Sequence, residues 1–205
     1  MITKEEFEEY CSKNNLRYKF ENKYCQEYRL KSNWNIIDLF MVLCRYGYIE
    51  TLKWFLTKEK INIHGNNEEA FMYSCIDNHL EVAKWLIEIS KENNKIINIH
   101  FLHDLVFRFS CWNGYIEIAK WLIEISKESG EIINIHANND DEFKKSCKWN
   151  NLEIAKWLCS LCDEYYIEIE NNRIVKYGIK NMYHTYLDEN KGIKKVIKRL
   201  QLKVI

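Results

Sequence analysis

Three histidines recur at matching positions and are the first candidates for metal chemistry, because imidazole is a common metal ligand. They are His64, His100 and His136, and each ends an Ile-Asn-Ile-His segment. Equivalent atoms of stacked helical repeats lie roughly 8–10 Å apart, whereas zinc ligands lie about 2 Å from the metal. We therefore expect hydrogen-bonded structural or surface histidines, and not ligands of one shared metal ion.

Cysteine is the second residue type that could do chemistry, because the chain contains 8 of them. Four recur at steps of 31, 36 and 36 residues, namely Cys44, Cys75, Cys111 and Cys147. Buried cysteine packs as a small hydrophobe. Cys159 and Cys162 form a C-x-x-C pair without the second pair of a typical zinc site. We expect packing at these positions, and neither metal binding nor redox use.

Motifs of common enzyme classes are absent from the sequence. It contains no P-loop, no G-x-G-x-x-G, no G-x-S-x-G and no H-E-x-x-H. With 6 glycines in total, a loop that cradles phosphate is not expected. The acid pair Asp140-Asp141 lies at an expected helix start, where capping explains it. We predict a non-enzymatic protein with no catalytic residue, no cofactor and no metal site.

The repeated residues define the elements that must position them. In residues 137–170, the acids at 140–142 suit the N-cap and first turn of a helix. Phe143, Ser146 and Cys147 then share one helical face. An Asn-Asn turn leads to a second amphipathic helix, and an alternating Ile-Glu-Ile segment predicts a short extended tip. A helix pair this small cannot bury its apolar face alone, so neighbouring units must stack.

A tryptophan register follows the same spacing, with Trp54, Trp85, Trp121 and Trp157 in the second helices. Their place in the apolar pattern predicts core or half-buried side chains. Trp112 and Trp149 lie outside that pattern, beside the turn. They are predicted either as exposed interface anchors or as packing between repeats.

These residues resemble ankyrin repeats. The Leu of the family's Thr-Pro-Leu-His opening corresponds to Phe40, Phe71, Phe107 and Phe143, and its second Ala to the repeated cysteines. The family's Gly-His turn corresponds to Gly47-Tyr48, Asn78-His79, Gly114-Tyr115 and Asn150-Asn151. The chain has no proline, so no unit keeps the Thr-Pro opening. The Ile-Asn-Ile-His and Ala-Lys-Trp-Leu segments are similar to the divergent ankyrin-repeat proteins of giant DNA viruses of amoebae.

The resemblance implies an all-α, ankyrin-like helical-repeat solenoid with N- and C-terminal caps. The predicted parts are an N-terminal cap over 1–37, four repeats at about 38–65, 66–101, 102–137 and 138–171, and capping helices over 171–205. Thr3 and Glu6 have the spacing of a capping box, and alternation over residues 16–28 predicts a hairpin. Apolar residues at helical spacing between 193 and 200 predict the last helix.

By resemblance, the chain is a non-enzymatic adaptor or scaffold that binds an unidentified protein, a host protein if the chain is viral. The implied contacts are the tips and the first helices. The tip candidates are His64, Asn66, Asn67, His100, His103, His136, Asn138 and Asn139. The first-helix candidates are Met41, Met72, Arg108 and Lys144, joined by Trp112 and Trp149. Methionine adapts to varied partners, and arginine is enriched at interfaces.

The alternative function is binding to nucleic acid or an anionic membrane through a basic C-terminal helix. Its candidate residues are Lys194, Lys195, Lys198 and Arg199, which a solvated cap helix also explains. The 30 basic and 30 acidic residues cancel, which disfavours binding to nucleic acid through overall charge. No signal sequence or run of about 20 apolar residues is present. We expect an intracellular, cytoplasmic monomer, in the host cytoplasm if viral.

Overall fold

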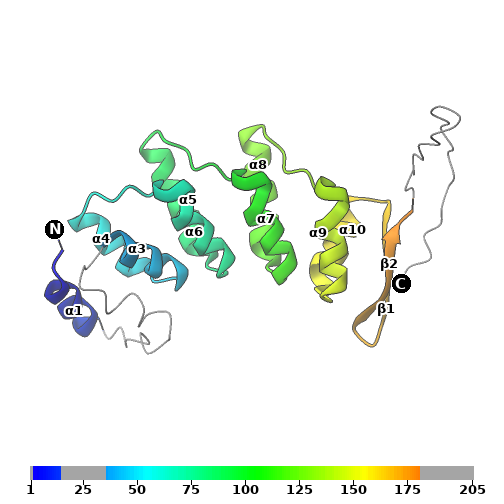
Figure 1. The fold of residues 1–205 in the computed structure, drawn as a ribbon, viewed down its shortest axis with the longest axis horizontal. Helices are drawn as coiled ribbons and strands as arrows, with labels where there is room; N and C mark the ends of the chain where they lie inside the picture. The colour runs from blue at the N-terminus through cyan, green and yellow to red at the C-terminus, as the bar shows by residue number, and fades with distance from the viewer. Residues whose placement is uncertain (1, 15–35, 181–205) are drawn as a thin grey trace, which may run out of the picture. The chain divides into compact units, whose positions relative to one another are not determined.

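The computed structural model describes residues 2–14 and 36–180 of the 205-residue chain (Figure 1). The described residues fall into two compact units, one ending at Val106 and the other beginning at Phe107. The predicted hairpin over 16–28 and the predicted basic helix lie outside the described residues.

The first unit contains α1 (Lys4–Lys13), α3 (Ile36–Arg45), α4 (Ile49–Lys58), α5 (Gly65–Ile76) and α6 (Leu80–Glu92). Helix α7 (Phe101–Asn113) spans the boundary between the units. The second unit continues with α8 (Ile116–Ser129), α9 (Ala137–Lys148), α10 (Leu152–Leu161), β1 (Tyr165–Glu170) and β2 (Arg173–Ile179). Helix α3 packs against α4 and α5, and α9 packs against α10. The predicted all-α repeat fold is confirmed, with a strand pair added at the end of the second unit.

The repeated phenylalanines and cysteines form the core of the first helices. Phe40, Phe71, Phe107 and Phe143 are buried, as are Cys44, Cys75, Cys111 and Cys147. This arrangement follows from their four-residue spacing, which places each Phe and its Cys on one helical face. The prediction that the repeated cysteines serve packing is therefore confirmed.

The turn between paired helices has one backbone conformation in every repeat. Gly47, Asn78, Gly114 and Asn150 all have positive φ, between 57° and 79°. Glycine and asparagine are the residues that tolerate the left-handed conformation best. The next backbone N–H donates to the carbonyl five residues earlier, for example from His79 to Ser74 at 2.7 Å. This bond closes the end of the first helix and fixes the direction of the second.

Helix α1 covers the free side of the first repeat. The predicted capping box is confirmed, because Thr3 Oγ1 accepts from the Glu6 N–H and the Glu6 side chain accepts from the Thr3 N–H. Phe7 packs edge-to-face on Phe55, and Tyr10 stacks on Trp54 with ring centroids 4.1 Å apart. Apolar surface of α4 is thereby removed from water.

The strand pair closes the other end of the described chain. Strands β1 and β2 are antiparallel, with an irregularity between Glu168 and Ile169, and they pack against α10 and α9 respectively. Tyr165 stacks on Phe143 at 4.1 Å, nearly parallel, and so covers the last Phe of the repeat register. The extended tip predicted at 167–169 is confirmed as part of β1. The predicted capping helices are wrong for residues 173–179, because aromatic and branched side chains there pair as a strand.

Candidate partner-binding tips and first-helix surface

Each tip begins with a side chain that accepts a backbone hydrogen bond. Asn98 Oδ1 accepts the His100 N–H at 2.9 Å, and Asn134 Oδ1 accepts the His136 N–H at the same distance. The equivalent bond at the first tip, from the His64 N–H to Asn62 Oδ1, is 3.2 Å. Asparagine makes this local turn readily, so its recurrence before each histidine has a structural cause.

Each tip histidine pairs with an acid four residues later, and we call each such histidine–acid pair a brace. Nδ1 of His64 lies 2.9 Å from Glu68 Oε2, that of His100 lies 2.6 Å from Asp104 Oδ1, and that of His136 lies 2.8 Å from Asp140 Oδ1. Sequence reasoning missed these pairs, although the repeated four-residue spacing was a usable signal. It assigned the acids to helix capping instead. Asp140 does lie in the first turn of α9, as predicted, but its side chain pairs with the N-cap residue His136, which itself makes no side-chain cap bond.

The histidine–acid pairs accompany a left-handed backbone at the start of α5, α7 and α9. Residues 102–104 and 138–140 have φ between 49° and 61°, and Asn67 and Glu68 are also left-handed. Non-glycine residues adopt this conformation at a cost, so the surrounding contacts must hold it. At the starts of α7 and α9, this backbone leaves two of the three side chains between the histidine and the acid exposed. Leu102, His103, Asn138 and Asn139 are exposed as a consequence.

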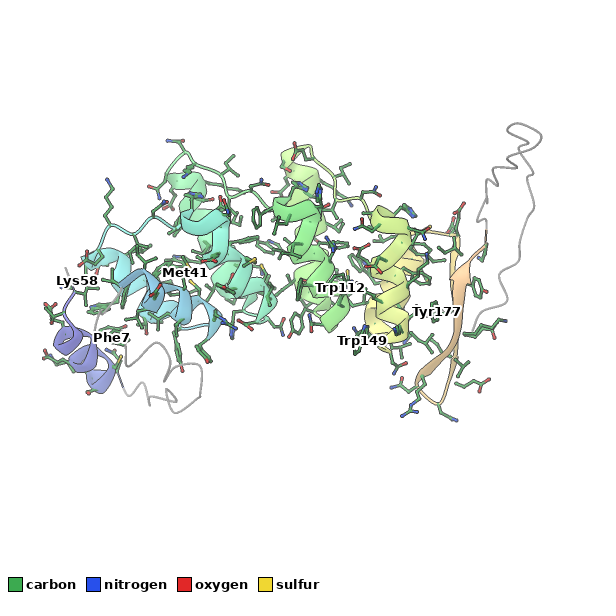
Figure 2. All side chains as sticks on the ribbon, viewed as in Figure 1. Phe7, Met41, Lys58, Trp112, Trp149 and Tyr177 are labelled. Carbon is green, nitrogen blue, oxygen red and sulfur yellow. The ribbon has the colours of Figure 1, made fainter. Side chains whose placement is uncertain are left out.

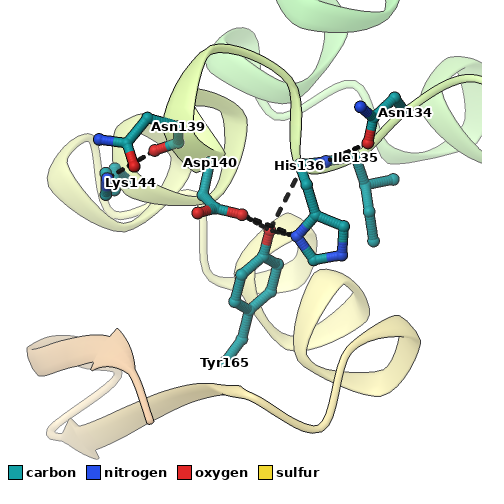
Figure 3. A network of polar contacts seen from close by, with 7 residues as sticks. All are labelled: Asn134, Ile135, His136, Asn139, Asp140, Lys144 and Tyr165. Carbon is teal, nitrogen blue, oxygen red and sulfur yellow. Dashed lines mark hydrogen bonds and ion pairs between the residues drawn. The ribbon is translucent and has the colours of Figure 1, made fainter. Parts of the chain in front are cut away.

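In the second unit, the brace extends to the strand pair (Figure 3). Tyr165 Oη donates to Asp140 Oδ1 at 2.5 Å and lies 3.0 Å from His136 Nδ1. Burial is the first cause that raises the pKa of Tyr165, followed by its hydrogen bond to Asp140. Tyr165 therefore stays a hydrogen-bond donor at neutral pH, and it ties the last histidine tip to β1.

The nominated tip residues differ in the surface they offer. The His64 side chain is 7% exposed, whereas that of His136 is 51% exposed. His64 is therefore mainly part of the brace. Asn67 and His103 are exposed in the first unit, and the backbone of Asn66 lies in the first turn of α5. The contact role of all these residues stays a prediction.

The nominated first-helix residues are also uneven. Met41 is buried and belongs to the core, whereas Met72 is half-buried. Lys144 is half-buried and donates to the Asn139 carbonyl at 2.5 Å. Trp149 is 67% exposed and forms the C-cap of α9. Trp149, labelled in Figure 2, is thus an exposed aromatic side chain among the first-helix candidates.

Arg108 faces a buried carboxylate that sequence reasoning did not anticipate. The Glu142 side chain is 1% exposed, and Arg108 Nε lies 3.4 Å from its Oε1. Neither Glu142 oxygen has a hydrogen-bond partner among the described residues. One and two repeats earlier, the same position holds Val106 and Ala70, both buried. Burial raises the pKa of Glu142, and Asp141 adds to the rise while Arg108 opposes it.

The ring of Trp112 contacts two cations of the second unit. Lys145 Nζ is 3.6 Å from its ring centroid, and Arg108 Cζ is 5.3 Å away. In the first unit, Arg45 lies 4.8 Å above the ring of Tyr73. Arg45 and Trp112 occupy one repeat position, and Tyr73 and Lys145 another. Neighbouring repeats therefore keep a cation–π contact at these two positions. The first position holds the cation in one case and the aromatic ring in the other.

Burial determines the chemistry of several cysteine thiols. Burial raises the pKa of Cys147 to about 12 and raises those of Cys75 and Cys159. Thiols in this state are poor nucleophiles and poor metal ligands at neutral pH.

Within residues 2–14 and 36–180, no group of three or more His, Cys, Asp or Glu side chains is placed to hold a metal ion. Among the described helices, none has the length and apolar character needed to span a membrane.

Comparison with known proteins identifies the repeats. No curated protein and no solved structure matches the chain, so nothing supports the resemblance to viral proteins. A family model described as ankyrin repeats in three copies matches residues 40–137. The match covers three of the buried Phe and Cys pairs, the left-handed turns at Gly47, Asn78 and Gly114, and the tips at His64 and His100. The family model therefore finds three ankyrin repeats within residues 40–137.

Proposed function

We propose that this chain is a non-enzymatic adaptor or scaffold that binds a protein partner through its tips and first helices. Ankyrin repeats are generally protein–protein interaction modules and are typically non-enzymatic. The observation that carries the proposal is the shared construction of the tips. A histidine–acid pair supports exposed side chains at equivalent positions of the tips, so the exposed groups are held in place before a partner arrives.

Pre-organisation is the physical reason why this construction suits binding. Ordering a loop on binding costs conformational entropy, which reduces affinity. At these tips the left-handed segment is already tied by the Asn–His and His–acid hydrogen bonds. Residues such as His103 and Asn138 can therefore contact a partner with little further ordering. The contact residues differ from repeat to repeat, which gives each tip its own specificity.

The test is affinity capture with quantitative mass spectrometry on tip variants of each unit. One variant carries Asn67→Ala with His103→Ala, and the other carries Asn138→Ala with Asn139→Ala. A matched control carries Lys91→Ala with Glu92→Ala, two exposed residues at the end of α6. The braces are left intact in all three, so folding is expected to be unchanged by circular dichroism.

We expect at least one tip variant to lose a partner that the control retains. An interface side chain at the centre of a contact contributes about 2 kcal/mol or more, which corresponds to a loss of about 30-fold in affinity. If both tip variants and the control retain every partner equally, the tips do not form the contact surface and the proposal fails.

A further inference from the structure

The first helices change chemical character along the repeats. At the three positions that follow the buried phenylalanine by one, two and five residues, α5 holds Met72, Tyr73 and Ile76. At the same positions α7 holds Arg108, Phe109 and Trp112, and α9 holds Lys144, Lys145 and Lys148. All three positions are therefore basic in α9, and the last of them changes from isoleucine to tryptophan and then to lysine, although the buried phenylalanine of each helix stays the same.

Lys145, Lys148 and Trp149 lie on one face of α9, because their spacing is i, i+3 and i+4. Trp112 contacts Lys145 and extends this face onto α7. We call Trp112, Lys145, Lys148 and Trp149 the basic–aromatic surface. It lies within the second unit, and Figure 2 labels its two tryptophans.

The charge of the basic–aromatic surface is only partly compensated. Lys145 pairs with Asp141 at 2.8 Å, whereas Lys148 is exposed and makes no ion pair among the described residues. The segment from Phe143 to Trp149 contains three lysines and no acid. Lysines in a last turn also complement the helix dipole. That effect does not account for a 67% exposed tryptophan beside them.

The exposed tryptophan of this surface, Trp149, favours a partner. Exposed tryptophan gains free energy when a partner covers it, and it is enriched among interface residues that dominate affinity. An occupant that brings carboxylate oxygens and an apolar side chain would complement both the lysines and the tryptophans.

We propose that the basic–aromatic surface binds an acidic peptide segment of a partner protein. The segment carries Asp or Glu next to an aliphatic or aromatic residue. The carboxylate meets Lys148 and Lys145, and the apolar side chain covers Trp149. This inference rests on the proposed function, because it names the chemistry of the partner for one surface of the binding module.

Nucleic acid fits the same surface less well. Its affinity depends on many phosphate contacts, and the basic–aromatic surface has two lysines. Asp141 and the buried Glu142 lie on the same helix and oppose a long polyanion. A short acidic segment needs only one or two contacts of this kind, and it can place its apolar residue on Trp149.

The experiment begins with a selection of short random peptides displayed on phage against the full chain. We expect the selected peptides to be enriched in Asp and Glu beside apolar residues. A fluorescent copy of one selected peptide is then titrated by anisotropy. We expect Trp149→Ala to weaken binding about 30-fold and Lys148→Glu to weaken it about tenfold. Lys120→Glu, at an exposed position of α8, is the matched control and should leave binding unchanged.

Charge exchange makes the assignment specific. A peptide whose acid is replaced by lysine should bind Lys148→Glu better than it binds the unaltered chain. The inference is overturned if the selected peptides are not acidic or if neither variant weakens their binding. It is also overturned if a short DNA duplex binds this surface while acidic peptides do not. If selected peptides are lost only in the tip variants, the proposed function stands and the basic–aromatic surface is not the site.

Discussion

Replacing the Arg108–Glu142 ion pair by apolar residues that earlier repeats hold at the same positions should stabilise the second unit. The double variant carries Arg108→Met and Glu142→Val. The new residues are those found at the equivalent positions of two earlier repeats, namely Met72 and Val106. The carboxylate is 1% exposed and the guanidinium 21% exposed, and the ion pair is long at 3.4 Å. Desolvation of Glu142 is therefore poorly offset. Replacement of such buried pairs by apolar residues of similar size stabilises proteins by about 1–4 kcal/mol.

The two single variants should behave differently from each other. Arg108→Met leaves the buried Glu142 carboxylate without its cation, and we expect a loss of about 3 kcal/mol. Glu142→Val leaves Arg108, whose side chain is 21% exposed although its Nε is buried without a hydrogen-bond partner, and it removes two unsatisfied oxygens. We expect it to be neutral or to stabilise by about 1 kcal/mol. The double-mutant cycle then reports a coupling energy between the two sites.

The assay is urea and thermal unfolding followed by circular dichroism. A gain of about 2 kcal/mol corresponds to a rise in Tm of roughly 4–8 °C for a chain of this length. The reasoning is refuted if the double variant loses more than about 1 kcal/mol while the single variant Glu142→Val also loses stability. That outcome would show that the carboxylate forms favourable interactions that outweigh its desolvation.

The pH dependence of the same site provides an independent check. The pKa of Glu142 is raised above its ordinary value of 4.5, so the unfolded chain releases this proton first as the pH rises. Stability is therefore lost from about pH 4.5 upward until the folded group has ionised. We expect Glu142→Gln to match the unaltered chain below this window and to become relatively more stable above it. A constant difference at all pH values would contradict the buried carboxylate as its cause.

Three further predictions follow from single contacts. Gly47→Ala should cost about 1–3 kcal/mol in urea unfolding, because φ is +73° and the added Cβ would lie 2.4 Å from His79 Nδ1. Gly130→Ala, also at positive φ but with open space around it, should cost about 1 kcal/mol, and equal losses would show that the His79 contact is irrelevant. Tyr165→Phe keeps the stacked ring but removes the bond to Asp140, so thermal unfolding should report a loss of about 1–2 kcal/mol, and no loss would argue against that bond. Native thiol labelling read by mass spectrometry should modify Cys159 before Cys75, which is buried, and the reverse order would contradict the placement of the cysteine register.

Local features of the fold were predictable because they depend on neighbouring residues. The buried Phe and Cys follow from helical spacing, and the turns at Gly47 and Asn78 follow from the tolerance of Gly and Asn for positive φ. The capping box at Thr3 and Glu6 is likewise a short-range signal. Each of these features is decided within about six residues of chain.

The candidate site was only partly predictable, because exposure depends on what packs nearby. Met41 and Met72 occupy one repeat position, yet Met41 is buried and Met72 is half-buried. Residues 173–179 carry aromatic and branched side chains whose strand partner, β1, precedes them, and sequence reasoning assigned them to helices. Trp149 and Trp112 were left open between interface and packing, and the structure exposes Trp149 while Lys145 lies over the ring of Trp112.

The sequence by itself determined the repeat register, the helix–turn–helix unit and the all-α repeat fold, because hydrophobic spacing and turn chemistry act over short distances. Only the tertiary structure showed that the tip histidines are braced by acids and that Tyr165 joins the last brace. It also showed that Glu142 is buried where other repeats hold Val106 and Ala70. These properties depend on which side chains pack together. The sequence around a charged residue does not show whether neighbouring helices will shield its side chain from water.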